Sequence, residues 1–485
     1  MKKKRYEKLA EDIAALIHSG VLQAGERAPS IRSACASWNV SPATVFKAYY
    51  LLESRGLIQA RAKSGYYVLA QPKVVVLTSN TVTTLSKKSA VAVNTPTIVQ
   101  VSDLVFSLLE SVRDRSIVPL GSAFPDPVLF PVQRLAKSAA HALRFVQPET
   151  LVTDMPLGVL DLRRQIAQRY ALADVLLSPD EVMITTGAME ALNLCLQAVT
   201  KPGDYVAIES PAFYASLQVL ERLQLKAVEI PVDVQGMDID LLQQALTQYP
   251  VKACWLMSSF QNPTGASLSD AKKQQLVELL TAQQIPLIED DVYHELYFGN
   301  VAPKPVKAFD LEGWVMHCSS FSKCLAPGYR VGWVSAGRFS QQVQRLKLMT
   351  TISPSIPAQA ALADYLQHGG YDRHLRKLRQ HLQQQYQAMV EAIQRHFPAD
   401  TQISAPDGGY FLWLTLNPAI NSLSLFQQAL AAGISIAPGP MFSASQQFGH
   451  CLRLNYGALA LEDIEPAIKR LAGLIESKKL AGAFN

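Results

Sequence analysis

The stretch WVMHCSSFSKCLAPGYR, residues 314–330, decides the fold. Its first five residues form a short apolar run that ends in hydroxyl side chains, which is typical of a buried strand followed by a loop. Lys323 lies in that loop. A lysine is usually a solvated surface charge, but the carboxyl edge of an α/β sheet is where ligands bind. Lys323 is therefore the first candidate functional residue.

From about residue 101 onward, apolar strand-like runs alternate with helical segments. This alternation predicts an α/β domain with a mostly parallel sheet and helices on both faces. The stretch TTGAME, residues 185–190, leads into an apolar helix expected over 191–199. A glycine turn at a helix N-terminus offers backbone N–H groups to a phosphate, although the same pattern alone is more often a plain helix start.

Two further strand-like runs, 251–260 and 285–288, end in stretches that contain Asn262, Asp290 and Tyr293. With Lys323, these strand ends present an amide, a carboxylate, a phenol and an amine, the set that pyridoxal 5′-phosphate needs. The lysine forms the Schiff base, the aspartate keeps the pyridine nitrogen protonated, and the amide and the phenol hydrogen-bond the ring's 3′-oxygen. We therefore expect these four residues to bind that cofactor.

The composition predicts a globular protein of two or three domains, because the chain has 485 residues and 49% of them are hydrophobic. No stretch reaches membrane-spanning length, and acidic residues interrupt the basic start, so we expect a cytoplasmic protein. The six cysteines show neither metal nor disulfide spacing, which favours reduced, buried thiols and gives no metal site.

The positive charge is concentrated at the front of the chain. Residues 1–75 hold twelve Lys and Arg against five Asp and Glu, whereas the whole chain has a net charge of +5. A polyanion partner is one explanation, and a solvated basic face is the ordinary one. Between about 71 and 100 the composition turns to Ser, Thr, Val and Lys with little periodicity, which predicts a linker.

The front segment has the pattern of a helix-turn-helix. Apolar residues recur at helical spacing over 6–17, a short helix is expected over 30–37, and Ser41-Pro42 opens a second one. Residues 57–68 then predict a small β-hairpin, or wing. A small structural helical domain is the alternative for such a pattern.

Residues 6–68, with GERAPS at 25–30, VSPATV at 40–45 and GYYV at 65–68, resemble the GntR-type winged helix-turn-helix. The resemblance implies binding to double-stranded DNA. The residues implied to face DNA are Arg32, Ser41, Thr44 and Lys47, with Arg61 and Lys63 near the wing. Pro42 stands where relatives commonly have an arginine, so one expected contact is missing.

Residues from about 118 to 475 resemble a fold-type I aminotransferase domain with a smaller C-terminal α/β subdomain. The phosphate ligands that this resemblance implies are Gly187, Ala188, Met189, Ser320, Ser322 and Arg330. Phe213 is implied to stack on the ring, with Tyr214 as the alternative, and Arg453 to take an amino acid's α-carboxylate. Thr153 stands where many relatives place a tyrosine that reaches the neighbouring subunit's phosphate.

The whole layout, a winged helix over 1–70, a linker over 71–100 and an aminotransferase-like domain over 101–485, resembles the MocR subfamily of bacterial regulators. That resemblance implies a homodimer and a regulator that senses an amine or amino-acid effector through an external aldimine in place of Lys323. A working aminotransferase with an accessory N-terminal domain is the alternative. A third hypothesis is that pyridoxal phosphate itself is the signal.

Overall fold

The chain divides into two structural units, residues 1–80 and 81–485. In this computed structural model the described residues are 5–18, 22, 25–38, 40–54, 57–61, 65–69, 96–111, 114, 116–149, 156–368 and 370–482. No helix within those ranges is long and apolar enough to cross a membrane.

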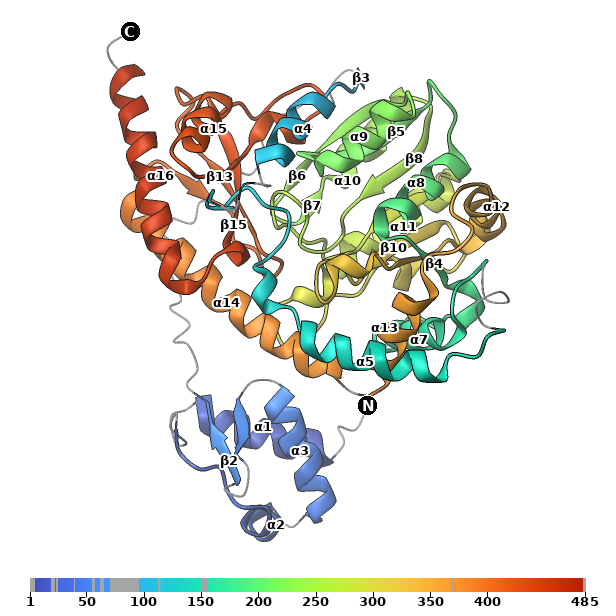
Figure 1. Cartoon of the computed structure of the whole chain (residues 1–485), viewed down its shortest axis with the longest axis vertical. Helices are drawn as coiled ribbons and strands as arrows, with labels where there is room; N and C mark the ends of the chain where they lie inside the picture. The colour runs from blue at the N-terminus through green and yellow to red at the C-terminus, as the bar shows by residue number, and fades with distance from the viewer. Residues whose placement is uncertain are drawn as a thin grey trace. The chain divides into compact units, whose positions relative to one another are not determined.

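The N-terminal unit is a three-helix cluster followed by a hairpin (Figure 1). Its elements are α1 (Arg5–His18), α2 (Ile31–Trp38), α3 (Pro42–Ser54), β1 (Ile58–Arg61) and β2 (Gly65–Val68). Ser30 caps α2 by accepting from Ser33 N at 3.1 Å, and Ser41 caps α3 by accepting from Thr44 N at 3.3 Å. β1 and β2 pair antiparallel. This is the predicted helix-turn-helix with its wing.

The second unit is built on a large sheet in the strand order β3-β6-β5-β8-β9-β10-β11-β4, with β7 paired to β6 (Figure 1). The strands are β3 (Thr97–Ile98), β4 (Met183–Thr185), β5 (Tyr205–Ser210), β6 (Lys226–Asp233), β7 (Gly236–Met237), β8 (Val251–Leu256), β9 (Leu287–Asp290), β10 (Val315–Ser320) and β11 (Gly332–Ser335). The run from β6 to β10 is parallel, and β3, β4, β7 and β11 pair antiparallel with their neighbours. The sheet is therefore mostly parallel, as the alternating pattern predicts.

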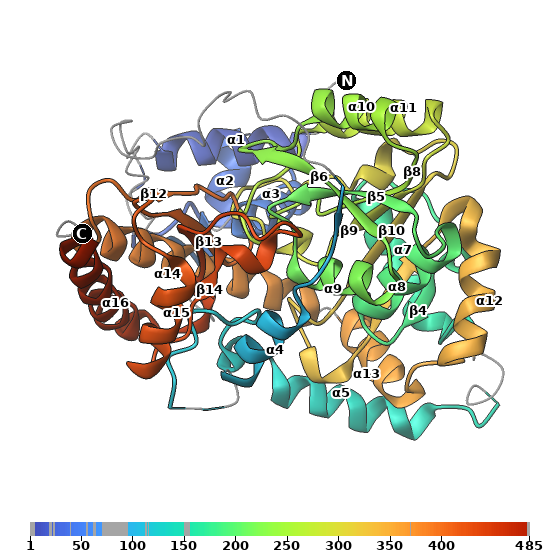
Figure 2. The same ribbon diagram turned by 90° about the horizontal axis from the view of Figure 1, so that it is seen from above.

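Helices cover both faces of this sheet (Figure 2). They are α5 (Val132–Phe145), α7 (Leu160–Leu172), α8 (Ala188–Val199), α9 (Tyr214–Arg222), α10 (Ile239–Gln248), α11 (Asp270–Ala282), α12 (Ser340–Thr350) and α13 (Ile356–Gln367). Alternate residues of β5 enter two separate cores. Val206 and Ile208 pack with residues of α8 and α9, whereas Ala207 packs with residues of α10 and α11. Burial on both faces explains why these strands are continuously apolar.

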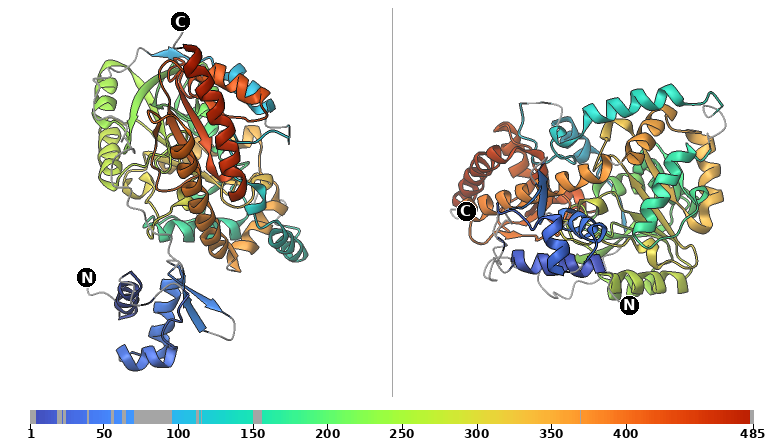
Figure 3. Two further views of the ribbon diagram at one scale, coloured as in Figure 1. Left: turned by 90° about the vertical axis from the view of Figure 1, so that its left-hand side faces the viewer. Right: turned by 90° about the horizontal axis from the view of Figure 1, so that it is seen from below.

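The smaller subdomain carries an antiparallel sheet in the order β12-β13-β15-β14, and its long helices α14 and α16 lie side by side (Figure 3). Its elements are α14 (Gly370–His396), β12 (Gln402–Ile403), β13 (Phe411–Thr415), α15 (Ser422–Ala431), β14 (Ala437–Pro438), β15 (Cys451–Asn455) and α16 (Leu461–Gly482). Helix α4 (Ser102–Ser111) lies between β3 and β4 in the chain. Buried Glu229 of β6 ties the large sheet to the stretch 443–445, which lies between β14 and β15 of the smaller subdomain. It accepts hydrogen bonds from Ser443 Oγ at 2.8 Å, Ala444 N at 3.0 Å and Ser445 Oγ at 2.6 Å.

Two predicted boundaries are wrong. The strand expected over 251–260 ends at Leu256, because Met257 N turns away from the ladder to donate to Glu209 Oε2 at 2.9 Å and Phe260 has a left-handed φ of 52°. The helix expected from residue 191 begins at Ala188, since Gly187 serves as its N-cap with a φ of 78° that favours glycine.

Candidate functional site

Lys323 lies in the loop after β10, at the carboxyl edge of the large sheet. Its Nζ donates to Ala123 O at 2.9 Å and lies 3.9 Å from the centroid of the Phe124 ring. Burial lowers the pKa of Lys323 to about 7, and the positive charge of Arg453 acts in the same direction. A large fraction of this amine is therefore neutral near pH 7, which is the form that attacks a carbonyl.

Three buried polar atoms near this lysine have no hydrogen-bond partner among the described residues: Asp290 Oδ1, Asn262 Nδ2 and Arg453 Nε. Asp290 ends β9, Asn262 follows β8, and Arg453 lies on β15, so three separate elements supply them. An unsatisfied buried polar group costs about 1–3 kcal/mol, so such groups in one place indicate a ligand or ordered water. The set fits pyridoxal phosphate, which offers a ring nitrogen and a phenolic oxygen.

The carboxyl of Asp290 is held in an unusual electrostatic state. Burial and the negative charge of Asp291 raise its pKa to about 7, although the nearby Lys323 acts to lower it. A protonated pyridine nitrogen beside this carboxylate would favour its charged form. Asp290 therefore fits the role expected from the sequence, that of the partner to the ring nitrogen.

Arg453 is fully buried, although it is a cation. Its Nη1 donates to Asn262 Oδ1 at 2.9 Å, and its Nη2 donates to Gly121 O at 2.6 Å and Ser122 O at 3.1 Å. The described part of the chain offers this guanidinium no carboxylate, and burial lowers its pKa. A desolvated guanidinium held only by neutral oxygens is suited to bind a ligand's carboxylate.

The residues expected around a phosphate also come together. Gly187 precedes α8, and a Cβ on Gly187 would lie 2.6 Å from Arg330 Nη2, so only glycine lets that guanidinium approach the turn. Arg330 Nη1 donates to Ser322 Oγ at 3.2 Å, and Ser322 N donates to Ser320 Oγ at 3.4 Å. The first amides of α8, which belong to Ala188 and Met189, add the positive end of the helix dipole, and together these groups fit a phosphate dianion.

Aromatic side chains line the same region. Burial raises the pKa of Tyr293, so its phenol is neutral and able to donate, and its ring meets those of Tyr410 and Phe411 edge-on at 5.4 and 5.6 Å. Phe213 is the N-cap of α9 and is half-buried, with its ring 4.9 Å from that of Tyr214. Tyr214 is buried, and the nearby charge of Arg453 acts to lower its pKa. Phe213 therefore keeps the more accessible ring of the two.

The segment 121–124, which the sequence did not predict as part of the site, borders it with main-chain carbonyl groups. Its carbonyl oxygens accept from Lys323 and Arg453, and Ala123 O accepts in addition from Tyr410 OH at 3.1 Å. Asn455 Nδ2 fixes the segment by donating to Ser122 O at 3.0 Å. Backbone carbonyl groups are common to all residues, so the sequence gives no signal that the segment 121–124 belongs to the site.

Some predicted residues lie outside the described part of the structure. These are Thr153 and Lys63 altogether, and the side chains of Arg32 and Arg61. In the N-terminal unit, Ser41 and Thr44 come together at the start of α3, where their hydroxyl oxygens are 2.9 Å apart, and Lys47 is exposed one turn further on.

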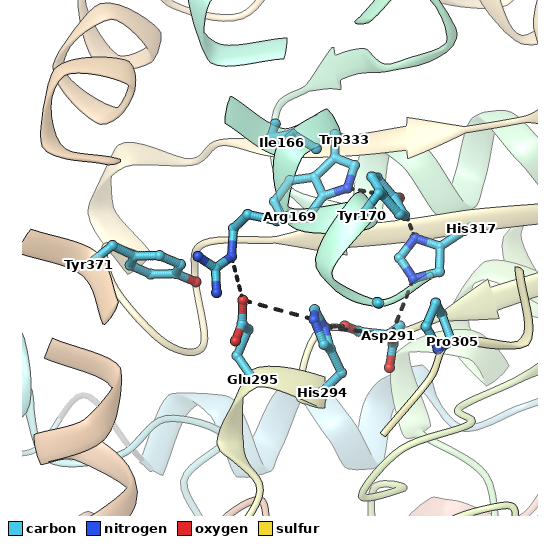
Figure 4. Close-up of a pocket in the computed structure, with 11 residues that line it drawn as sticks. Ile166, Arg169, Tyr170, Asp291, His294, Glu295, Pro305, His317, Trp333 and Tyr371 are labelled. Atoms are coloured by element: carbon cyan, nitrogen blue, oxygen red, sulfur yellow. Dashed lines mark hydrogen bonds and ion pairs between the residues drawn. The ribbon is translucent and has the colours of Figure 1, made fainter. Parts of the chain in front are cut away.

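A second pocket is lined by residues of α7, of β10 and of the stretch that follows β9 (Figure 4). There Tyr170 OH lies 2.6 Å from His317 Nδ1, and His317 Nε2 lies 3.2 Å from Asp291 Oδ2. Glu289, Asp291 and His317 offer donor atoms close enough together for a metal ion. However, Glu289 already accepts from Ser258 Oγ at 2.5 Å and from backbone N–H groups at 2.6 and 3.0 Å. We therefore assign this cluster a structural role.

Two family models match the chain. The model described as aminotransferase class I and II matches residues 125–471, and the model described as bacterial regulatory proteins, gntR family, matches residues 5–68. The first covers more than half of the chain, and the second coincides with the winged helix-turn-helix.

One relative matches the whole chain, and the solved structures match its larger part. The chain is 47% identical to an uncharacterized HTH-type transcriptional regulator of Escherichia coli, YdcR, over 98% of this chain and 100% of that protein. Among solved structures, the multiple substrate aminotransferase of Thermococcus profundus superposes with a TM-score of 0.72 at 28% identity, covering 82% of this chain and 97% of that one. The kynurenine aminotransferase of Pyrococcus horikoshii also gives 0.72, at 29% identity, over 77% and 94% of the two chains. The chain therefore belongs to the GntR-type transcriptional regulators that carry a class I and II aminotransferase domain, the arrangement of the MocR subfamily that its sequence resembles.

Proposed function

We propose that this regulator binds DNA through its N-terminal unit and senses an amino acid through pyridoxal 5′-phosphate held in its second unit. The observation that carries the proposal is Arg453, a buried guanidinium without a carboxylate partner in the described chain, which shares Asn262 with the cofactor site. A cofactor pocket alone would serve any amine. This arginine selects an amine that also bears a carboxylate.

The residues divide the work between cofactor and effector. Asp290 would hold the ring nitrogen, Asn262 and Tyr293 would hold the ring oxygen, and the turn at Gly187 with Arg330 would hold the phosphate. When bound, pyridoxal phosphate supplies a carbonyl that combines with primary amines. Lys323, whose pKa burial lowers to about 7, would be the protein's own amine at that carbonyl, and an effector's amine would compete with it there.

The effector's carboxylate would then accept the hydrogen bonds that Arg453 Nη2 donates to Gly121 O and Ser122 O in its absence. The segment 121–124 would then keep its hydrogen bonds from Asn455 and Tyr410 but lose those from Arg453, and a shift of this segment would carry the signal toward the linker. A homodimer would place two winged helices on paired DNA half-sites. The switch requires only that the effector binds the two conformations with different affinities.

The test is DNA binding by the full-length protein loaded with pyridoxal phosphate, first to its own upstream region and then to a random duplex pool. Amino acids are added one at a time. Effector-dependent DNA affinity that Lys323→Ala abolishes supports the proposal. A change in DNA affinity on adding pyridoxal phosphate without any amino acid, lost in Lys323→Ala but unchanged in Arg453→Met, would make pyridoxal phosphate itself the signal.

A working aminotransferase is the second candidate function, because the residues proposed to hold the cofactor and the effector would also support transamination. A relative named aromatic-amino-acid aminotransferase 1, from Thermococcus litoralis, is 30% identical over 76% of this chain. Sustained turnover of an amino acid with a keto acid, together with no DNA binding under any condition, would establish this alternative.

A further inference from the structure

The exposed face of α3 carries two large aromatic side chains. Phe46 is 54% exposed and Tyr50 is 63% exposed, and they are the large hydrophobic residues exposed to this degree within the described part of the N-terminal unit. They lie four residues apart, so they share one face of the helix. Exposed Lys47 adjoins Phe46, whereas Val45, Ala48 and Tyr49 are buried in the unit's core. Two neighbouring exposed aromatic rings on a small domain indicate an interaction surface.

The position of this face suits DNA better than it suits a protein partner. The second helix of a helix-turn-helix enters the major groove with its N-terminal residues at the base edges, and Phe46 is the fifth residue of α3. Residues 1–75 hold twelve basic against five acidic residues, which complements a polyanion. Lys47 places one of these charges on the same face.

The polar groups at the start of α3 already have structural partners. Ser41 Oγ caps the helix and lies 2.9 Å from Thr44 Oγ1, and Pro42 has no side-chain donor. After the small exposed side chains of Pro42 and Ala43, the next exposed side chains of α3 are therefore Phe46 and Lys47. In the major groove, the C5-methyl of thymine is the group that apolar side chains contact, and phenylalanine is one of them.

We propose that Phe46 is a specificity-determining residue whose ring packs on the C5-methyl group of a thymine in the operator. Lys47 beside it contacts the phosphate backbone, which adds affinity without selecting sequence. This inference rests on the proposed function, because it assumes that the N-terminal unit binds DNA. It adds that the unit reads part of its operator by apolar contact, at Phe46.

The test removes the methyl group alone. The full-length protein selects a duplex from a random pool, and each thymine of that duplex is then replaced by deoxyuridine, which keeps the base pair and the O4 acceptor. A buried methyl group is worth about fourfold in affinity. Wild type should therefore lose about fourfold at one thymine in each half-site. Phe46→Ala should bind the thymine and uracil duplexes equally, whereas Phe46→Leu should keep part of the difference.

Val132→Ala is the matched control, because Val132 is an apolar side chain that is 66% exposed in the other unit. It should show the wild-type response. A wild-type protein that binds the selected duplex but ignores every uracil overturns the inference and leaves the proposed function intact. An undiminished uracil effect in Phe46→Ala also overturns it, as does a change in oligomeric state with no change in base preference. Failure to enrich any duplex would instead contradict the proposed function.

Discussion

Replacing Arg453 with methionine should separate recognition of the effector's carboxylate from recognition of its amine. Methionine has a similar volume and no charge, and Arg453 is fully buried. A hydrogen bond to a charged group contributes about 1.5–3 kcal/mol, and a carboxylate would make two of them. Because Nη2 must first leave Gly121 O and Ser122 O, we expect a net loss of about 3 kcal/mol, or roughly 100-fold in affinity.

The assay pairs each amino acid with its decarboxylated amine, for example alanine with ethylamine, and follows the absorbance of the bound cofactor. Arg453→Met should lose the preference for the amino acid and keep the response to the amine. The free energy of unfolding should change by less than about 2 kcal/mol, because a buried cation replaced by an apolar side chain is often neutral.

Arg169→Met is the matched control, since Arg169 pairs with Glu295 at 2.7 Å in the second pocket. Its loss removes the closest cation from the buried carboxylate of Glu295, although His294 Nε2 stays 3.9 Å away, and should destabilise the fold by about 3 kcal/mol, with the preference for amino acids unchanged. Equal weakening of amino acid and amine in Arg453→Met would refute the assignment of Arg453 to the carboxylate.

Three further predictions concern Lys323, Gly187 and the hydrogen bonds that Glu229 accepts from residues 443–445. Because burial lowers the pKa of Lys323 to about 7, its neutral form prevails above that pH, so stopped-flow uptake of pyridoxal phosphate should accelerate with a midpoint near pH 7; a midpoint near pH 10 would contradict this. Gly187→Ala adds a Cβ 2.6 Å from Arg330 Nη2 at a φ of 78°, and should weaken cofactor binding at least about tenfold in a fluorescence titration while the protein stays folded. Glu229→Ala leaves Ser443 and its neighbours without an acceptor and should lower the free energy of unfolding in urea by about 3 kcal/mol, whereas a change below about 0.5 kcal/mol would show that this contact is dispensable.

Most of the cofactor site could be predicted from the residues that follow the ends of the predicted strands. Apolar runs of four to six residues predict buried parallel strands, and the polar residues after them meet at one sheet edge because parallel strands point the same way. The structure brings Lys323, Asp290 and Asn262 together in this way. The run at 251–260 shows the limit of this reasoning, since Met257 and Phe260 continue the apolar run but Met257 N leaves the ladder to donate to Glu209 Oε2.

The sequence by itself determined the two units, the order of their elements and the residue types that can hold pyridoxal phosphate, because these depend on periodicity and on local turn chemistry. Only the tertiary structure decided which groups share the site. Arg453 meets Asn262 and Gly121 across about two and three hundred residues of chain, and the main-chain oxygens of 121–124 look like any others in a sequence. The exposure of Phe46 was also decided by packing, because α3 buries Val45 and Tyr49 on either side of it. Hydrogen-bond partners and exposure are properties of the assembled surfaces, so they become visible only when the elements are packed together.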